Sequence, residues 1–342
     1  MRITKQARIK ASEAADIIPY LMGSGLVDRS AKISKDGDHR LVPIMSGMED
    51  ELVRMGYEIT EGPAYTMERS TPQERILNEL SDLPEEVLRS LPMKWEYAGD
   101  VVIVKIDETC IPYKGTIGKA YADILGAKTV CADSNGIVGE LRRPSTEVIY
   151  GNDTESVRLE NGIFYEFDVS RIMFASGNTD ERQRMKELDC GGETVVDMFA
   201  GIGYFTLPIA KFTGARKVFA CEKNPDSYYY LTKNIERNGV FERTIPILGD
   251  NRHIPGKRFA DRVVMGYVQT TSLFLPKALE IVKYGGMIHY HDTFYVNEYE
   301  ERIEEIFSKA AGEGFEIESI KEVKSFAPSV SHYVADVRIF NS

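Results

Sequence analysis

The stretch Val195-Val-Asp-Met-Phe-Ala-Gly-Ile-Gly203 indicates the fold more clearly than any other part of the sequence. It has the pattern of a buried apolar strand that ends in an aspartate and passes through a glycine turn into a helix. Gly201 and Gly203 allow the backbone to approach a ligand that side chains would keep away. Many β-to-α turns need glycine for purely structural reasons, so the rest of the chain must show whether a ligand binds here.

From about residue 171 strands and helices alternate at the spacing of βαβ units, which predicts a parallel sheet whose first strand is the one before this turn. The expected strands are residues 193–197, 217–222, 244–248, 262–265 and 287–291, and the expected helices are 205–211, 225–238 and 298–311. Two extended stretches, 315–323 and 332–340, follow the last helix. A parallel α/β sheet that ends on an antiparallel pair is typical of the Rossmann-like class I methyltransferase fold. We therefore expect a mixed seven-stranded sheet over residues 171–342.

Two smaller α+β modules are expected before this domain, over residues 1–75 and 76–170. The first shows a helix pattern at 11–21 and a strand at 40–44. The second shows a helical stretch at 72–91, a buried strand at 100–106, a helix at 117–125 and a strand at 129–130. Strands at 146–150 and 164–167 flank an Asn161-Gly162 turn, which is a strong hairpin signal.

Composition narrows the class of protein. The 342 residues contain 43% hydrophobic and 28% charged side chains, which is ordinary for a globular protein. No apolar run reaches the roughly 18 residues of a membrane span, and the basic N-terminus lacks the apolar core of a secretory signal. The four cysteines are widely spaced, which disfavours a disulfide framework or a zinc ribbon. We expect a cytoplasmic protein without membrane contact, and a monomer by default.

The net charge of −11 is unusual for a nucleic-acid enzyme, because phosphate contacts supply much of the affinity. Basic residues are clustered, however, and a basic patch on an acidic protein can still bind RNA. The densest set lies in the first module and comprises Lys5, Arg8, Arg29, Lys32 and Lys35. A solvated surface is the more usual interpretation of any one patch.

Three successive expected strands end in acidic or amide side chains, namely Asp197, Glu222 and the pair Asp250-Asn251. The carboxyl ends of parallel strands meet at one edge of the sheet, where such folds bind ligands. Asp197 suits an ammonium group or the orientation of the turn, Glu222 a ribose diol, and Asp250-Asn251 an adenine edge. The glycine spacing lacks the third glycine of NAD-binding turns, since Phe205 lies close to that position. The arrangement therefore favours S-adenosylmethionine.

Two further segments flank this site. Residues 174–182 form either a polar helix cap or a cover over the cofactor in which Arg182 pairs with its carboxylate. Met265-Gly-Tyr-Val268 stands where methyltransferases acting on base amines carry an Asn-Pro-Pro-aromatic element. Its lack of the Asn and prolines disfavours methyl transfer to an amine, and Tyr267 either stacks on a base or packs internally. His289 and His291 share a strand face without convincing further ligands, so no metal is expected.

These residues together resemble the archaeal wyosine-biosynthesis tRNA aminocarboxypropyltransferases, relatives of the tRNA guanine-37 N1-methyltransferases. The resemblance covers about residues 80 to 340, and it is looser for the first module. It rests on these stretches: Leu91-Pro92 with Trp95 and Gly99-Asp100, 171–174 with Asn178 and Glu181-Arg182, 196–203, Asp250-Asn251, 260–268, 288–291 and Ala327-Pro328.

The resemblance implies transfer of the 3-amino-3-carboxypropyl group of S-adenosylmethionine to C7 of 4-demethylwyosine at position 37 of tRNA(Phe), in the anticodon loop. It implies Glu181 as the base that removes the C7 proton, and Ser176 in place of a polar residue that relatives carry at position 175. The candidate cofactor-binding residues are Ser176, Arg182, Asp197, Phe199, Gly201, Gly203, Glu222, Lys223, Asp250, Asn251, Gly266 and Tyr267. The alternatives are N1-methylation of guanine 37 and a non-catalytic tRNA-binding protein that keeps the cofactor fold.

Overall fold

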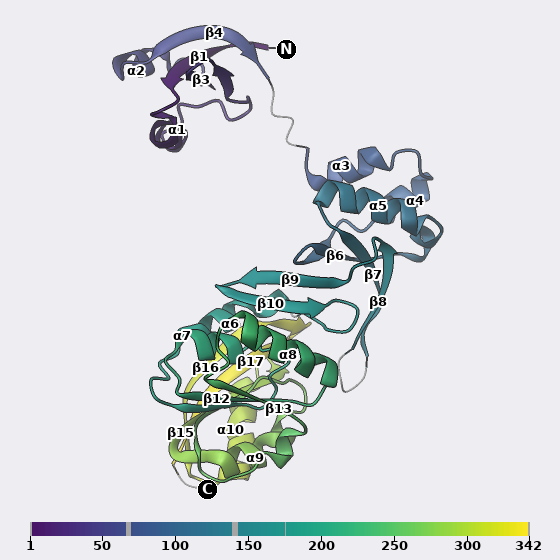
Figure 1. Ribbon diagram of the computed structural model, residues 1–342, viewed down its shortest axis with the longest axis vertical. Coiled ribbons are helices and arrows are strands. Elements are labelled where there is room, and N and C mark those ends of the chain that lie inside the picture. The colour runs from purple at the N-terminus through teal and green to yellow at the C-terminus, as the bar shows by residue number, and fades with distance from the viewer. Residues whose placement is uncertain (1, 66–69, 139–142, 175, 341–342) are drawn as a thin grey trace. The chain divides into compact units, whose positions relative to one another are not determined.

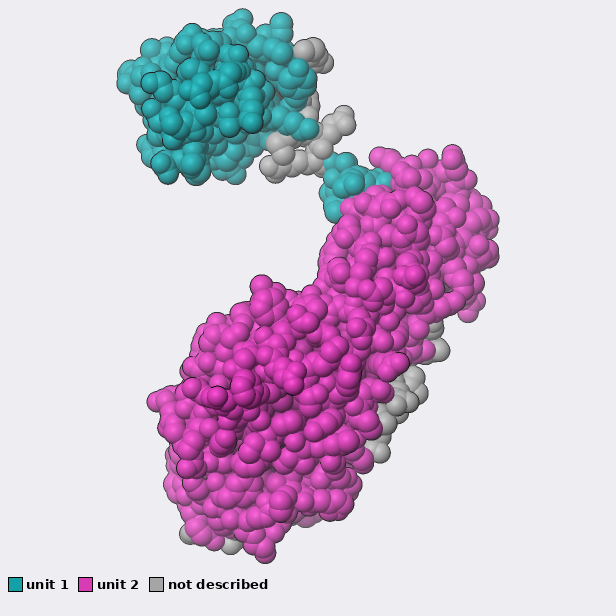
Figure 2. Space-filling model, viewed as in Figure 1, with its two compact units in different colours: residues 1–75 teal, residues 76–342 magenta. Residues whose placement is uncertain are grey.

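The computed structural model describes residues 2–65, 70–138, 143–174 and 176–340, without the side chains of residues 2, 134–138, 143 and 176. By their contacts the residues divide into two compact units, 1–75 and 76–342 (Figure 2). No helix in the described ranges is both long and apolar enough to cross a membrane.

Unit 1 is a four-stranded antiparallel sheet in the order β2-β3-β1-β4 with two helices. Its elements are β1 (Arg2–Lys10), α1 (Ala14–Gly23), β2 (Ser34–Asp36), β3 (His39–Pro43), α2 (Glu49–Arg54) and β4 (Glu58–Ala64). The predicted helix and strand are present as α1 and β3, but β1 was missed. Only Ala7 and Ile9 of β1 reach the apolar core, and the other residues of the strand are polar apart from Ile3, which is exposed, so no apolar alternation marks the strand.

Unit 2 begins with a four-stranded sheet in the order β5-β6-β7-β8. The division between the units falls within α3 (Pro72–Glu79), and the elements that follow are α4 (Glu85–Arg89), β5 (Trp95–Ala98), β6 (Val101–Lys105), α5 (Lys114–Leu125), β7 (Thr129–Val138) and β8 (Arg143–Tyr150). The single helix predicted over 72–91 is wrong, because the chain forms α3 and α4 instead. Pro84 has extended backbone angles and starts the second helix, since proline disfavours helix at the residue before it.

A two-stranded hairpin follows, β9 (Glu155–Glu160) and β10 (Ile163–Asp168). Asn161 and Gly162 both have positive φ, 52° and 82°, as a tight hairpin turn requires. The predicted turn is therefore confirmed, but its predicted first strand is wrong: residues 146–150 belong to β8, which pairs with β7. The hairpin contacts β5, and Phe164 N–H donates to Asn238 Oδ1 of the following domain at 3.0 Å. The predicted boundary at residue 170 stays a prediction.

The rest of unit 2 contains one seven-stranded sheet in the order β13-β12-β11-β14-β15-β17-β16. This part of the chain is drawn in green to yellow in Figure 1. The strands are β11 (Thr194–Asp197), β12 (Lys217–Glu222), β13 (Thr244–Leu248), β14 (Ala260–Met265), β15 (Val282–Tyr295), β16 (Phe315–Ala327) and β17 (Val330–Ile339). The first five pair in parallel, and β17 pairs antiparallel with both β15 and β16. The expected Rossmann-like class I methyltransferase fold is confirmed.

Helices cover both faces of this sheet. They are α6 (Thr179–Lys186), α7 (Thr206–Phe212), α8 (Pro225–Arg237), α9 (Leu275–Ile281) and α10 (Tyr299–Ala311). Neighbouring strand residues point to opposite faces. Val195 packs in the cluster that holds α7 and α8, and Val196 packs in the cluster that holds α9 and α10. With both faces covered, the carboxyl-end edge of the parallel strands stays open for a ligand.

Candidate functional site

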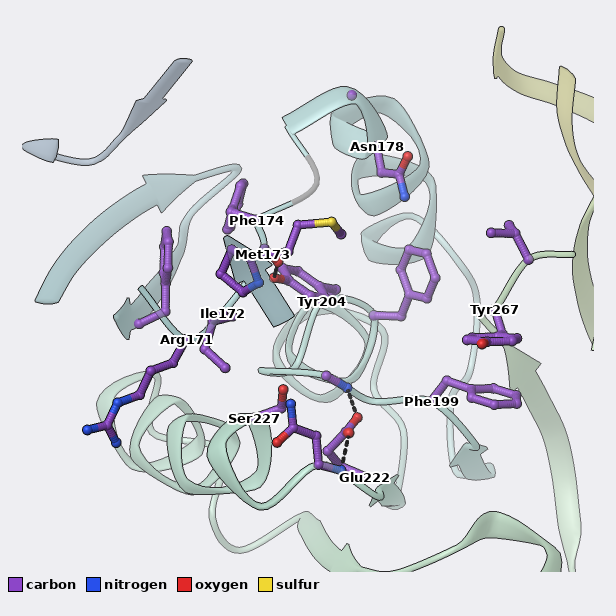
Figure 3. Close-up of a pocket in the computed structure, with 18 of the residues that line it drawn as sticks. Arg171, Ile172, Met173, Phe174, Asn178, Phe199, Tyr204, Glu222, Ser227 and Tyr267 are labelled. Carbon is purple, nitrogen blue, oxygen red and sulfur yellow. Dashed lines mark hydrogen bonds between the residues drawn. The ribbon is translucent and has the colours of Figure 1, made fainter. Parts of the chain in front are cut away.

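A cavity of about 980 Å³ lies at the carboxyl ends of the parallel strands of unit 2 (Figure 3). Drug-sized ligands occupy pockets of roughly 300–1,000 Å³, so this one has room for a nucleoside and more. Its walls come from the turns after β11, β12, β13 and β14, from the segment before α6, and from β5, β6, β16 and β17. Of the three predicted strand ends, those with Glu222 and with Asp250-Asn251 therefore line this cavity.

The glycine turn is built on a buried carboxylate. Asp197 is fully buried and accepts hydrogen bonds from Phe199 N–H at 3.1 Å and from the Thr206 hydroxyl at 2.8 Å. Burial raises the pKa of Asp197 to about 6, although these hydrogen bonds oppose the shift. Asp197 does not line the cavity, so the structure places it to orient the turn, one of the two roles expected from the sequence.

Two glycines give the turn its shape. Gly201 has φ of +56° and lines the cavity. Gly203 has φ of +103° and lies beneath the turn, where an added Cβ would come within 2.6 Å of Leu207 Cγ. Gly203 therefore allows close packing of the helix, and only Gly201 faces the ligand space.

Glu222 at the end of β12 lines the cavity and is held by two backbone groups. Gly201 N–H and Asn224 N–H each donate to one of its oxygens at 2.7 Å, as the dashed lines in Figure 3 show. Burial raises the pKa of Glu222, and the backbone hydrogen bonds counteract this. Each carboxylate oxygen has a second lone pair, so the fixed carboxylate can also accept from a ligand hydroxyl.

After β13, Asp250 and Asn251 line the cavity in different ways. Asp250 pairs with Arg252 at 2.6 Å and with Lys223 at 3.4 Å, and hydrogen bonding to Arg252 holds its pKa far below the usual range. Asn251 donates from Nδ2 to the Met198 carbonyl at 2.8 Å. Its Oδ1 is buried and has no hydrogen-bond partner among the described residues. Such an orphaned acceptor requires an explanation, and a ligand amine would satisfy it.

Aromatic rings close the side of the cavity next to β14. Tyr267 and Phe199 face each other in Figure 3. Their rings are stacked, with centres 4.9 Å apart and planes at 15°. Gly266 has no room for a side chain, because a Cβ there would lie 2.6 Å from the Phe205 ring. Of the two alternatives for Tyr267, the structure shows internal stacking on Phe199 at the cavity wall.

Arg182 is 2% exposed and lines the cavity. Its Nε donates to Glu160 at 2.5 Å, and its guanidinium lies over the Phe174 ring at 5.0 Å from the ring centre. These contacts fix the guanidinium at the inner wall. The side chain of Ser176 lies outside the described residues.

Glu181 is not among the residues that line the cavity. It is buried and forms a two-pronged ion pair with Arg184, at 2.7 and 2.8 Å. Burial raises its pKa, and Arg184 opposes the shift. The structure therefore brings Arg182, Phe199, Gly201, Glu222, Lys223, Asp250, Asn251, Gly266 and Tyr267 together at the cavity, but not Glu181, Asp197 or Gly203.

Sequence reasoning missed five basic or aromatic residues that line the cavity. Lys94 precedes β5, Trp95 lies on β5 and Lys105 on β6, whereas Lys324 lies on β16 and His332 on β17. No local sequence pattern predicts that they meet, because they come from strands far apart in the chain. The basic side chains among them were the only sequence signal for this part of the cavity, and basic residues are ordinary in number in this chain.

The histidines of β15 are engaged in other contacts. His289 Nδ1 lies 2.5 Å from Asp336 Oδ1, and His291 Nδ1 lies 3.1 Å from His332 Nε2. No group of three or more His, Cys, Asp or Glu side chains suited to a metal occurs in the described part of the chain.

The residues present fit S-adenosylmethionine. The turn at Gly201 leaves space for the ligand. The fixed carboxylate of Glu222 offers a partner for ribose hydroxyls, and the unpartnered Oδ1 of Asn251 offers one for an adenine amine. The cavity extends beyond these groups to Trp95 and His332, which leaves room for a second substrate.

Comparison with known proteins gives two matching family models, "TRM5/TYW2 methyltransferase domain" over residues 156–319 and "TYW2 N-terminal domain" over 74–154. The chain is 44% identical over 264 residues to a tRNA(Phe) (4-demethylwyosine(37)-C(7)) aminocarboxypropyltransferase of Pyrococcus horikoshii, covering 76% of this chain and 94% of that protein. The crystal structure of P. horikoshii TYW2 in complex with MeSAdo superimposes with a TM-score of 0.71 and 42% identity, covering 79% of this chain and 100% of that one.

A second relative matches more of the chain at lower identity. The tRNA (guanine(37)-N(1))-methyltransferase Trm5b of Pyrococcus abyssi is 31% identical over 343 residues, covering 98% of this chain and 99% of that protein.

Proposed function

The chain belongs to the TRM5/TYW2 family, and we propose on that basis that it transfers the 3-amino-3-carboxypropyl group of S-adenosylmethionine to C7 of 4-demethylwyosine at position 37 of tRNA(Phe). The enzyme releases methylthioadenosine and works in the cytoplasm. The observation that carries this proposal is the 44% identity to an enzyme of that name over three quarters of the chain. The cavity supports it, because its acidic strand-end residues suit the cofactor and the space lined by Trp95 and His332 can take a base.

The chemistry is decided by orientation. The sulfonium of S-adenosylmethionine activates all three carbons bound to it, so the product depends on which carbon faces the nucleophile. Here the electron pair of C7 forms the new carbon–carbon bond, and the electrons of the broken carbon–sulfur bond remain on sulfur. C7 then loses its proton and the ring recovers its aromaticity.

Each cofactor group has a proposed partner on the cavity wall. Glu222 accepts from the ribose hydroxyls, and Asn251 Oδ1 accepts from the adenine amine. Arg182, fixed by Glu160 and Phe174, pairs with the cofactor carboxylate. Asp197 acts indirectly, because it holds the turn that carries Phe199 and Gly201.

The basic and aromatic residues that line the cavity have the composition of an RNA-binding surface. Lys94, Lys105 and Lys324 bring positive charge, and Trp95 and Phe326 bring aromatic rings. Cations hold phosphates and aromatic rings stack on exposed bases. We assign these lining residues to contacts with the anticodon loop.

Unit 1 is proposed as a second tRNA contact. Lys32 and Lys35 are exposed there, while Lys5 pairs with Glu49 at 3.0 Å and Arg8 with Asp36 at 3.3 Å. The effective cationic patch is therefore smaller than the sequence suggested.

The second candidate function is N1-methylation of guanine 37. The observation that favours it is the match to Trm5b over 98% of this chain, which includes unit 1. The Met265-Gly-Tyr-Val268 turn, without the expected Asn and prolines, favours carboxypropyl transfer instead.

Two substrate tRNAs separate the candidates. The enzyme is incubated with S-adenosylmethionine and tRNA(Phe) carrying either 4-demethylwyosine or unmodified guanine at position 37, and the nucleosides are identified by mass spectrometry. The proposal expects an aminocarboxypropyl adduct on 4-demethylwyosine and an unchanged guanine. A methylated guanine 37 would support the second candidate, and no change in either tRNA would indicate a binding protein.

A further inference from the structure

Three buried side chains form a line from the cavity wall to helix α6. His332 on β17 lines the cavity, and its Nε2 lies 3.1 Å from Nδ1 of His291 on β15. On its other side, His291 Nε2 lies 3.4 Å from Glu181 Oε1. The pairing register explains the contact, because Thr293 is opposite His332 and His291 is two residues away on the same face.

His291 is fixed and incompletely satisfied. Its ring stacks on Phe205 with centres 5.2 Å apart and planes at 19°. The side chain is 1% exposed, and its Nε2 has no hydrogen-bond partner in the part of the chain described here. The 3.4 Å approach to Glu181 is within ion-pair reach but lacks hydrogen-bond geometry. A nitrogen buried in this way is positioned to exchange a proton with Glu181 after a small movement.

Both histidines are neutral near pH 7. Burial and the nearby Lys324 lower the pKa of His332 to about 4. Burial, His332 and Arg184 lower the pKa of His291 well below its usual value. A neutral imidazole carries one donor and one acceptor nitrogen, so a pair of them can accept a proton at one end and release one at the other.

The far end of the line is a carboxylate held in place. Glu181 is clamped by Arg184, and Arg184 also pairs with Asp336 at 2.8 Å. Asp336 in turn contacts His289 and Ser319. The charged and titratable groups facing the line are Lys324 and Lys321 of β16, Asp336 of β17, His289 of β15 and Arg184 of α6.

We propose that His332 is the base that takes the C7 proton, and that His291 passes the proton charge on to Glu181. This inference rests on the proposed carboxypropyl transfer. After the carbon–carbon bond forms, the C7–H electron pair returns to the ring and the proton goes to His332 Nδ1. His332 then gives its Nε2 proton to His291 Nδ1, and His291 gives its own Nε2 proton to Glu181.

The relay accounts for the position of Glu181. The sequence resemblance assigns the base role to this residue, yet the structure keeps it off the cavity wall. With His332 and His291 between them, the carboxylate receives the proton without touching the substrate. Glu181 and His291 are then positioning residues, and His332 is the group that meets the base.

The test measures the fate of the C7 proton. Single-turnover transfer is followed with tRNA whose 4-demethylwyosine carries hydrogen or deuterium at C7. We expect His332→Gln to slow transfer by roughly 10²- to 10⁴-fold, as for loss of a general base, with unchanged S-adenosylmethionine affinity. Proton removal then limits the rate, so a primary isotope effect appears that is larger than in the wild type. Added imidazole partly restores His332→Ala.

Two further variants separate a relay from a structural effect. His291→Phe keeps a ring against Phe205 but removes both nitrogens, and we expect the same isotope effect. His289→Gln removes a buried histidine of the same strand that lies outside the line, and we expect reduced thermal stability without the isotope effect.

A His332→Gln variant with the wild-type rate and isotope effect overturns the relay, and so does an equal isotope effect in His289→Gln. If the wild-type enzyme transfers no carboxypropyl group at all, the proposed function fails instead, and the two failures are distinguishable.

Discussion

Three buried carboxylates in unit 2 show how one physical cause serves different roles. Burial raises the pKa of Asp197, Glu222 and Glu181, because it disfavours the charged form. Asp197 holds a turn, Glu222 faces the ligand space, and Glu181 is locked by Arg184. A raised pKa alone therefore does not identify the residue that meets the substrate. The position of each carboxylate and its hydrogen-bond partners distinguish the three roles.

Asp197 makes stability depend on pH. Its pKa is about 6 in the folded protein against 3.8 when unperturbed, so the folded chain holds the proton more tightly. The resulting stabilisation is complete below about pH 4 and is lost as the pH rises through 6, an effect of roughly 3 kcal/mol. We expect the free energy of unfolding of wild type, relative to Asp197→Asn, to fall by that order between pH 4 and 7. Urea titrations at several pH values measure it, and a pH-independent difference would contradict the assignment.

Asn251 Oδ1 is expected to recognise the adenine amine. Wild-type protein should bind methylthioadenosine about tenfold more tightly than its analogue without the exocyclic amine, the effect of one hydrogen bond to a buried acceptor. In Asn251→Ala the two ligands should bind equally, although both more weakly than to the wild type. Calorimetry measures the four affinities. Equal binding of both ligands by the wild type would show that Asn251 Oδ1 meets another group.

At the scale of single residues, the sequence predicts the strand-end residues of the cavity well and its basic and aromatic lining residues poorly. Glu222, Asp250 and Asn251 follow regular strands, so their meeting at one edge can be derived from the fold alone. His332, Lys324 and Trp95 reach the cavity through pairings that depend on the whole sheet. The sequence also does not reveal that Glu181 pairs with Arg184 and does not line the cavity.

Among the structural elements, the turn after β14 is held in place by β15. Gln269 has φ of +79°, and its N–H donates to Asp292 Oδ1 at 2.5 Å. Asp292 also accepts from the Tyr290 hydroxyl at 2.9 Å. The turn is thus anchored to β15, and this fixes Tyr267 against Phe199 at the cavity wall.

Gly266 is expected to be intolerant of any side chain. Gly266→Ala places a Cβ about 2.6 Å from the Phe205 ring. Relieving such a clash typically costs about 1–3 kcal/mol, and the displaced ring should also weaken cofactor binding. Gly115→Ala in α5 is the matched control, since nothing lies within 4 Å of its Cβ position, and it should be neutral or slightly stabilising. Thermal melts and calorimetry compare the two, and equal stability would contradict the packing argument.

The elements of the seven-stranded sheet could be predicted because their patterns are local and strong. The strands 217–222 and 244–248 agree with β12 and β13 residue for residue. β1 and β9 were missed because polar side chains occupy part of their buried faces, namely Gln6 in β1 and Ser156 and Glu160 in β9. The break between α3 and α4 depends on Pro84, whose effect outweighed the helical pattern around it.

At the scale of the whole molecule, we assign the two units different roles: unit 2 holds the cavity, and unit 1 is the proposed additional tRNA contact. The cavity and all its lining residues belong to unit 2. The P. horikoshii TYW2 chain is matched completely by 79% of this chain, and unit 1 is about the size of the unmatched fifth. A protein of net charge −11 is expected to bind tRNA through localised cationic surfaces, and unit 1, with the exposed Lys32 and Lys35, is the proposed second one.

Deleting residues 1–70 is expected to separate cofactor binding from tRNA binding. Unit 2 has its own apolar clusters and should fold alone, so the affinity for S-adenosylmethionine should not change. The affinity for tRNA should fall, and its dependence on salt should become shallower because fewer phosphates are contacted. Titrations at several salt concentrations measure both quantities. Unchanged tRNA affinity would refute a role for unit 1 in binding.

The most direct test of the central claim, that the cavity presents the carboxypropyl arm rather than the methyl group to the base, uses S-adenosylmethionine labelled separately in each. With tRNA(Phe) carrying 4-demethylwyosine, we expect carboxypropyl label in the tRNA and methylthioadenosine in solution. Methyl label in the tRNA with release of S-adenosylhomocysteine would contradict the claim and make the chain a methyltransferase.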